Sequence, residues 1–162
     1  MAGVRITVEI SGVSPEALIS RLADANTEPL MTNIGAVLES STRERIEETK
    51  TAPDGSAWPP NRAGTSTLLQ TGRHLRDSIA FIATATQVEV GSSWEFAHVH
   101  QDGATIKPKD AERLSFMVGG KRAFARQVTI PARPFVGISA EDETEVSRVA
   151  TDFLKTLVGG AQ

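Results

Sequence analysis

Residues 51–67, with the sequence TAPDGSAWPPNRAGTST, separate two different kinds of pattern in this chain. The segment contains three prolines and two glycines. Because proline lacks a backbone donor and glycine is entropically costly in regular structure, neither a helix nor a central strand is expected to continue through it. Loops longer than about 12–15 residues are uncommon inside compact domains and are usually either functional or disordered. We therefore predict a long loop at 51–67, with helices before it and short strands after it.

The residues before this loop favour helices. Alternation of apolar and polar residues at 4–10 predicts one half-buried strand at the start of the chain. Ser14, followed by a proline and an acidic residue, predicts the beginning of a helix over 15–25. Apolar residues at helical spacing predict a second helix over 28–50, with the charged run at 43–50 largely on its solvent side.

The residues after the loop favour antiparallel strands. Apolar and alternating segments at 78–84 and 87–92 predict one hairpin. Segments at 113–118 and 123–130 predict a second hairpin around a glycine turn. Residues 96–104, between the hairpins, indicate a short helical turn or loop that a glycine closes.

The end of the chain carries the clearest helix signal. Ser139 and Asp142 have the spacing of a capping box, and apolar residues recur at helical period until Gly159 and Gly160. Hairpins without alternating helix crossovers predict an α+β fold. We expect an antiparallel sheet of about four to five strands, packed by two N-terminal helices and a long C-terminal helix, in a single domain over 1–162.

Composition limits the functions open to such a domain. The 162 residues include 17 basic and 20 acidic side chains, a net charge of −3, which argues against coating nucleic acid through overall charge. There is no cysteine, which excludes disulfides, thiolate metal sites and a cysteine nucleophile. The first ten residues lack a signal-peptide pattern, and no segment has the ~20 apolar residues of a membrane span. We expect a soluble, unprocessed chain without a membrane partner.

Three histidines raise the possibility of a metal site. His98, His100 and Asp102 supply imidazole and carboxylate groups, and a His-x-His pair on a strand would point both rings to one face. His74 is the remaining histidine, and the nearby carboxylates have no metal-binding spacing. Structural or inter-subunit hydrogen bonding is the favoured interpretation. The sequence also has neither a nucleophile elbow nor a phosphate-binding loop, so we expect no enzyme, no metal and no cofactor.

Several side chains are instead candidates for contacts with other proteins. Trp58 either anchors the long loop on the body of the protein or contacts a partner. In residues 129–139, Pro131 and Pro134 hold an extended corner in which Arg133 can make a planar bidentate contact and Phe135 can enter the core or a neighbouring subunit. The full set of interaction candidates is Trp58, Trp94, Phe96, His98, His100, Arg133 and Phe135.

A local basic region offers a further alternative. Lys121, Arg122 and Arg126 lie on the second predicted hairpin, and residues 107–113 carry charges of both signs. The hairpin is either an exposed tip that keeps the protein soluble or a contact to an acidic partner or to DNA phosphates.

Four motifs in order then suggest a family. The segments PDGSAWPP, LLQTGRHLRDSI, VEVGSSWEFAHVHQDGA and IPARPFVGIS, followed by a helix with an acidic cap, resemble the virion morphogenesis family of tailed bacteriophages, which includes tail completion proteins of Mu-like phages. The resemblance runs from about residue 53 to the final helix, and IPARPFVGIS is its most specific part. The first 50 residues lie outside it, and we interpret them as a packing scaffold.

The resemblance implies a non-enzymatic structural protein in tail completion and head–tail joining. We expect a homo-oligomeric ring, with a hexamer favoured, whose neighbours are tail tube or tail terminator proteins and head connector or neck proteins. DNA would pass the ring without sequence-specific contacts. The alternatives are a tail tube or head-completion connector subunit, or a small metal-dependent hydrolase. The expected location is the virion, at the head–tail interface or tail end, after assembly in the host cytoplasm.

Overall fold

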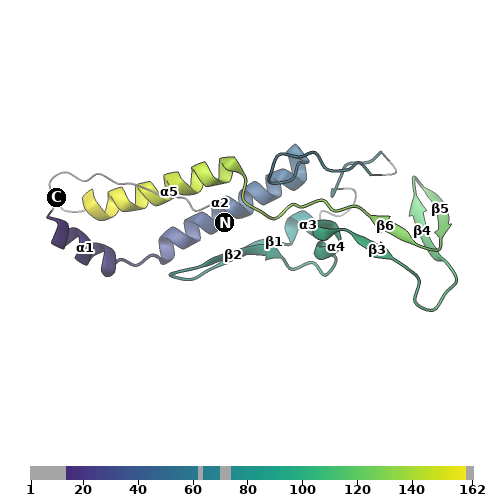
Figure 1. Cartoon of the computed structure of the whole chain (residues 1–162), viewed down its shortest axis with the longest axis horizontal. Helices are drawn as coiled ribbons and strands as arrows, with labels where there is room; N and C mark the ends of the chain where they lie inside the picture. Colours follow the sequence, from purple (N-terminus) through teal and green to yellow (C-terminus); the bar gives the residue numbers. More distant parts are fainter. Residues whose placement is uncertain (1–13, 62–63, 70–73, 160–162) are drawn as a thin grey trace. The chain divides into compact units, whose positions relative to one another are not determined.

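The computed structural model of the chain describes residues 14–61, 64–69 and 74–159. The strand predicted at 4–10 lies outside the described residues. Along the chain the elements are α1 (Pro15–Ala23), α2 (Glu28–Glu44), a π-helical turn (Arg45–Thr49), α3 (His74–Asp77), β1 (Ile79–Ala83), β2 (Val88–Ser92), α4 (Ala97–Asp102), β3 (Ala104–Ile106), β4 (Leu114–Val118), β5 (Lys121–Ala125), β6 (Val128–Ile130) and α5 (Ala140–Gly159) (Figure 1). The structure is therefore roughly α+β, as predicted.

The described residues divide into two compact units. The helical unit comprises 14–40, 81–90 and 138–159, and the mixed unit comprises the described residues of 41–80 and 91–137. Each unit is assembled from segments that are distant in sequence, because the chain passes between the units within α2, β1 and β2 and again before α5. The expectation of a single domain over 1–162 stays a prediction.

In the helical unit, capping residues place the helix ends as the sequence predicts. The Ser14 hydroxyl accepts a hydrogen bond from the Ala17 amide at the start of α1. At α5, the Ser139 amide donates to the Asp142 carboxylate over 2.8 Å, and the Asp142 amide donates to the Ser139 hydroxyl over 3.2 Å. These reciprocal bonds satisfy two backbone donors that a helix start otherwise leaves unpaired, which confirms the capping box.

The helices of this unit contact each other through specific groups. α1 packs on α5, and the Arg21 guanidinium donates to the carbonyls of Leu157 and Val158 over 3.3 Å each. A cation at the carboxyl end of a helix is favourable because the last carbonyls lack partners there. On α2, a Cβ added at buried Gly35 would lie 2.2 Å from the Phe81 ring, so the absent side chain allows this close packing.

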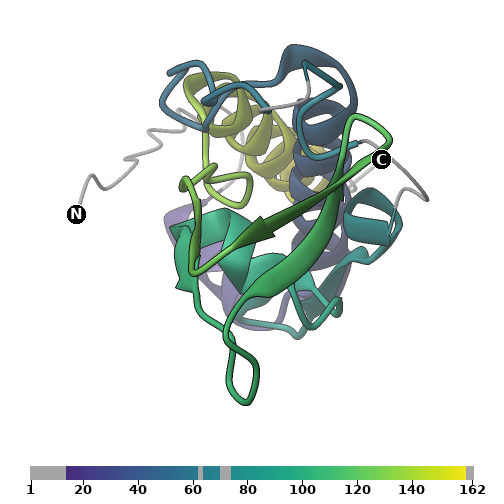
Figure 2. The ribbon, with the colours of Figure 1, turned by 90° about the vertical axis from the view of Figure 1, so that its right-hand side faces the viewer.

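Within residues 14–61, 64–69 and 74–159 the strands form three two-stranded sheets, whereas one sheet was expected. β1 pairs with β2 and β4 pairs with β5, as the two predicted hairpins require. β3 pairs antiparallel with β6, with Thr105 opposite Thr129. The residues predicted as one strand at 123–130 are thus divided between two sheets, and the three-residue strand β3 was not predicted. Figure 2 shows β4 and β5 as adjacent strands joined by a tight turn.

The fully buried apolar side chains lie in the mixed unit. Ile46, Ile79 and Phe135 have exposed fractions of 0%, 0% and 1%. Arg45 is also buried, at 5% exposure, so the prediction that the charged run 43–50 lies largely on the solvent side is wrong for this residue. The π-helical turn that carries Arg45 and Ile46 ends at Lys50, whose left-handed φ of 58° stops it. The core of this unit therefore includes a buried cation beside apolar side chains.

Candidate functional site

The segment 131–137 of the mixed unit is an irregular corner that other segments hold through hydrogen bonds to its backbone. It follows β6 and precedes α5, and it belongs to no sheet. A buried segment without strand partners must satisfy its peptide groups in other ways. The loop 51–61, the π-helical turn and α4 supply those partners, as the following contacts show.

Arg133 joins the corner to the loop. Its Nε donates to the Pro59 carbonyl over 2.8 Å and its Nη2 donates to the Pro60 carbonyl over 3.2 Å. Its own amide donates to the His100 carbonyl over 2.8 Å. The residue is 5% exposed, and burial lowers the pKa of Arg133. The predicted bidentate contact therefore exists, but it is made to two carbonyls of the same unit.

Three successive carbonyls of the corner each accept one side-chain donor. The Trp58 indole donates to the Pro134 carbonyl over 2.9 Å, and Arg45 Nη1 donates to the Phe135 carbonyl over 2.8 Å. Gln101 Nε2 donates to the Val136 carbonyl over 3.2 Å. Trp58 is 7% exposed, so it fits the alternative in which it anchors the long loop.

Gln101 also accepts from the corner, and sequence reasoning missed it. Its Oε1 accepts hydrogen bonds from the amides of Phe135 and Val136 over 3.0 and 3.1 Å. One carboxamide thereby satisfies two donors and one acceptor of the extended backbone, as a neighbouring strand would. No local signal in the sequence distinguishes this glutamine, because its partners lie 34 and 35 residues away.

Two glycines allow the close approach of these segments. A Cβ at Gly137 would lie 2.6 Å from Cγ of Pro53 in the loop. A Cβ at Gly103, where φ is 76°, would lie 2.7 Å from the Ala132 amide nitrogen. Both distances are too short for a side chain, so the corner, the loop and the end of α4 fit together only with glycine at these positions.

An aromatic cluster lies at the start of α4. The Trp94 ring meets Phe96 edge-on and stacks on His100 at an interplanar angle of 14°, both with centroids 5.6 Å apart. Phe96 is 50% exposed, His98 is exposed, and Trp94 and His100 are half-buried. Burial, and then the charge of Arg133, lower the pKa of His100, which favours its neutral form.

The geometry of α4 does not suit the metal hypothesis. His98 and His100 lie on a helix, where residues two apart point in nearly opposite directions, and not on a strand as the hypothesis requires. Among the residues described, no group of three histidine, aspartate or glutamate side chains is arranged to hold a metal ion. His74, on α3, is not part of such a group either.

The seven interaction candidates therefore fall into two sets. Trp58, Arg133 and Phe135 are buried within the mixed unit and stiffen it. Trp94, Phe96, His98 and His100 form or adjoin the partly exposed cluster on α4. Sequence reasoning did not identify the exposed apolar residues Met117 and Phe124 of the β4–β5 hairpin, although it placed basic residues there.

Comparisons with known proteins extend these observations. A model of the phage virion morphogenesis family matches residues 16–155. The chain is 26% identical over 156 residues to "Mu-like prophage FluMu G protein 2" of Haemophilus influenzae, an alignment that covers 94% of this chain and 99% of that protein. No solved structure matches the chain significantly. None of the helices described here is long and apolar enough to cross a membrane.

Proposed function

The chain belongs to the phage virion morphogenesis family, and from that premise we propose that it acts in tail completion and head–tail joining. Copies of the protein form a ring at the end of the assembled tail and present a surface to the neck of the head. The observation that carries this proposal is the family match over residues 16–155, which includes the whole of the corner and most of α1 and α5. Family membership favours a structural role over catalysis.

The corner supports an assembly role through its stiffness. Arg45, Trp58, Gln101 and Arg133 fix its backbone before any partner binds. A contact surface on a preorganised scaffold loses less conformational entropy on association. The aromatic cluster of α4 and the β4–β5 hairpin expose apolar side chains in the same unit, and these are the contact elements in our proposal.

Phe96 is the side chain in the α4 cluster that best suits a partner contact. Half of its surface is exposed, and its ring forms a T-shaped pair with the Trp94 ring. Aromatic side chains with few rotamers are over-represented among residues that dominate interface energies. Trp58 and Phe135 are buried, so their replacement would impair assembly through loss of stability, whereas replacement of Phe96 tests the contact itself.

Electron microscopy of lysates from a phage with this reading frame interrupted tests the proposal. We expect filled heads beside unattached tails, together with rescue by the intact protein supplied from a plasmid. Rescue by a Phe96→Ser variant should be weaker than rescue by an Ile82→Ser control, in which another exposed apolar residue is replaced. Infectious, joined particles in the interrupted phage would contradict the assembly role. A complete lack of tails would instead indicate a tail tube subunit.

A further inference from the structure

The β4–β5 hairpin carries an exposed apolar face. Met117 and Phe124 are 62% and 61% exposed. Their cross-strand partners are Arg122 and Ser115, so all four side chains lie on one side of the ribbon. We call these four residues the hairpin face. Among the described residues neither strand pairs with a third strand, and apolar residues of the opposite side are only half-buried. A two-stranded ribbon of this kind is at best marginally stable alone in water, so a partner would stabilise it.

Charge around the hairpin face is positive although the chain is acidic. Residues 107–126 contain six basic and two acidic side chains, a net charge of +4, against −3 for the whole chain. The described residues of the helical unit contain ten acidic and three basic side chains. Opposite charges on two surfaces increase the rate of encounter and select the orientation of binding. The helical unit of a second copy is therefore an electrostatically suitable partner for the hairpin.

Helix α1 of the helical unit offers a face of matching chemistry. Ile19 and Leu22 are 67% and 44% exposed, and Glu16 is exposed one turn before Ile19. Residues three apart on a helix are surface neighbours, so these side chains form one continuous face, which we call the α1 face. The basic residue of α1, Arg21, donates to carbonyls at the end of α5 and does not belong to this face. The α1 face therefore combines two apolar side chains with one carboxylate.

We propose that the hairpin face of one copy of this protein docks on the α1 face of a second copy. Met117 and Phe124 contact Ile19 and Leu22, and Arg122 lies opposite Glu16. The inference rests on the proposed role in assembly, which it deepens by naming the contact between copies. Because the two faces are different surfaces of each copy, the contact is head-to-tail, and repetition of it produces a ring when the rotation closes.

The contact is weak between two isolated copies. A few side chains on each face bury far less than the roughly 1,200 Å² at which stable interfaces begin. Its ionic part weakens with added salt because both charges are exposed. When several copies are bound at the end of a tail, their effective concentration is high. This strengthens the contact without any new interaction.

Disulfide cross-linking between separate copies tests the contact, because the chain has no cysteine of its own. A Met117→Cys protein is mixed with an Ile19→Cys protein that carries a tag of different size, and the heterodimer is followed on non-reducing gels. The matched control replaces Ile19→Cys by Ile82→Cys, whose position is 71% exposed and also in the helical unit. We expect at least about tenfold faster heterodimer formation for the Ile19→Cys pair, since docking raises the local concentration. Equal rates would overturn the proposal.

Charge exchange tests the ion pair separately. Adding Arg122→Glu to the Met117→Cys protein should slow cross-linking, and adding Glu16→Arg to the Ile19→Cys protein should restore it. All of these positions are exposed, and circular dichroism of each variant verifies the fold. Slower cross-linking without restoration would contradict the assigned pairing. Unchanged cross-linking, together with weaker binding of Arg122→Glu to double-stranded DNA, would overturn the proposal in favour of a DNA-binding hairpin.

The failure of this inference is distinguishable from the failure of the proposed function. If cross-linking shows no preference while the interrupted phage accumulates separate heads and tails, the assembly role holds and the named contact is wrong. If cross-linking is selective while the interrupted phage is infectious, the contact between copies holds and the assembly role is wrong.

Discussion

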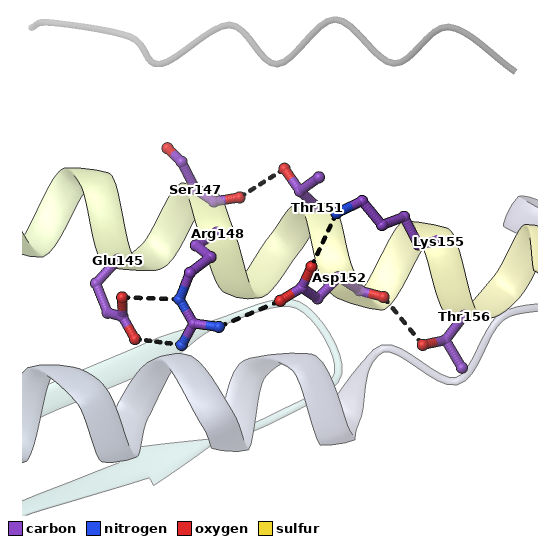
Figure 3. A network of polar contacts seen from close by, with 7 residues as sticks. All are labelled: Glu145, Ser147, Arg148, Thr151, Asp152, Lys155 and Thr156. Carbon is purple, nitrogen blue, oxygen red and sulfur yellow. Dashed lines mark hydrogen bonds and ion pairs between the residues drawn. The ribbon is translucent and has the colours of Figure 1, made fainter.

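The corner of the mixed unit and helix α5 of the helical unit are stabilised by different kinds of polar contact. In the mixed unit, buried side chains donate to backbone carbonyls across long stretches of sequence, as Arg133 does to Pro59 and Pro60. In the helical unit, charged side chains on α5 pair with neighbours one turn away, as Arg148 does with Glu145 and Asp152 (Figure 3). The first kind of contact determines how distant segments meet, whereas the second only supports a helix that forms locally. Stability should accordingly be sensitive to replacement in the mixed unit and tolerant of it on α5.

The largest effect is expected for Phe135→Ala. Phe135 is 1% exposed, and truncation of a buried phenylalanine costs about 3–5 kcal/mol through lost burial and a residual cavity. Urea unfolding of the variant measures this loss. Phe124→Ala, at a 61% exposed position, is the matched control and should have a far smaller effect on the unfolding midpoint. Equal effects of the two variants would mean that the corner is not the packed part of the molecule.

A smaller effect is expected for Gln101→Leu. The leucine keeps the approximate volume but leaves the amides of Phe135 and Val136 and the Val136 carbonyl without their partner. A buried polar group that loses its hydrogen bond costs about 1–3 kcal/mol, and the partial exposure of this site lets water reduce the loss. Hydrogen exchange should show faster exchange of the two amides in the variant. Unchanged exchange would show that Gln101 does not hold the corner.

A modest pH effect is expected at His100. The folded protein has a pKa of His100 below its usual value of about 6.5, so the unfolded chain binds a proton more readily. The free energy of unfolding should therefore fall as the pH is lowered below about 6.5 and be fully retained above it. Urea titrations between pH 5 and 8 measure this dependence, with His100→Gln as the comparison. The same slope in both proteins would assign the pH dependence to other groups.

The smallest effect is expected for Arg148→Ala on α5. The guanidinium makes bonds to two carboxylates, but all three side chains are exposed, and exposed ion pairs contribute little to stability. We expect an unfolding midpoint close to that of the original protein, with a slight loss that added salt removes. A loss comparable to that of Gln101→Leu would remove the distinction between the units.

Local signals explain most of what sequence reasoning predicted correctly. The capping box of α5, the start of α1 and the β1–β2 hairpin each depend on residues within one or two turns of each other. The prediction of one strand at 123–130 was wrong because the pairing of its second half depends on a distant segment. β6 pairs with β3 across more than 20 residues, and nothing in the three residues Ala104–Ile106 distinguishes a strand from an extended loop.

The candidate site was predicted in part for the same reason. The prolines and glycine of the corner indicated a constrained segment, but its partners Arg45 and Gln101 come from elements that carry no matching pattern. A charged run such as 43–50 looks solvent-exposed by composition, whereas buried Arg45 donates to the carbonyl of Phe135, 90 residues away in the sequence. Whether such a side chain points into the protein or into solvent depends on tertiary contacts, which local sequence patterns do not reveal.

The repeated passage of the chain between the two units has a consequence for synthesis. Residues 131–137 complete the mixed unit and residues 138–159 complete the helical unit, so both units need the last part of the chain. Almost the entire polypeptide must therefore be synthesised before either unit contains all of its segments. We therefore expect a chain that terminates near residue 130 to lack both the corner and α5, so that neither unit is complete and its exposed apolar surface favours aggregation.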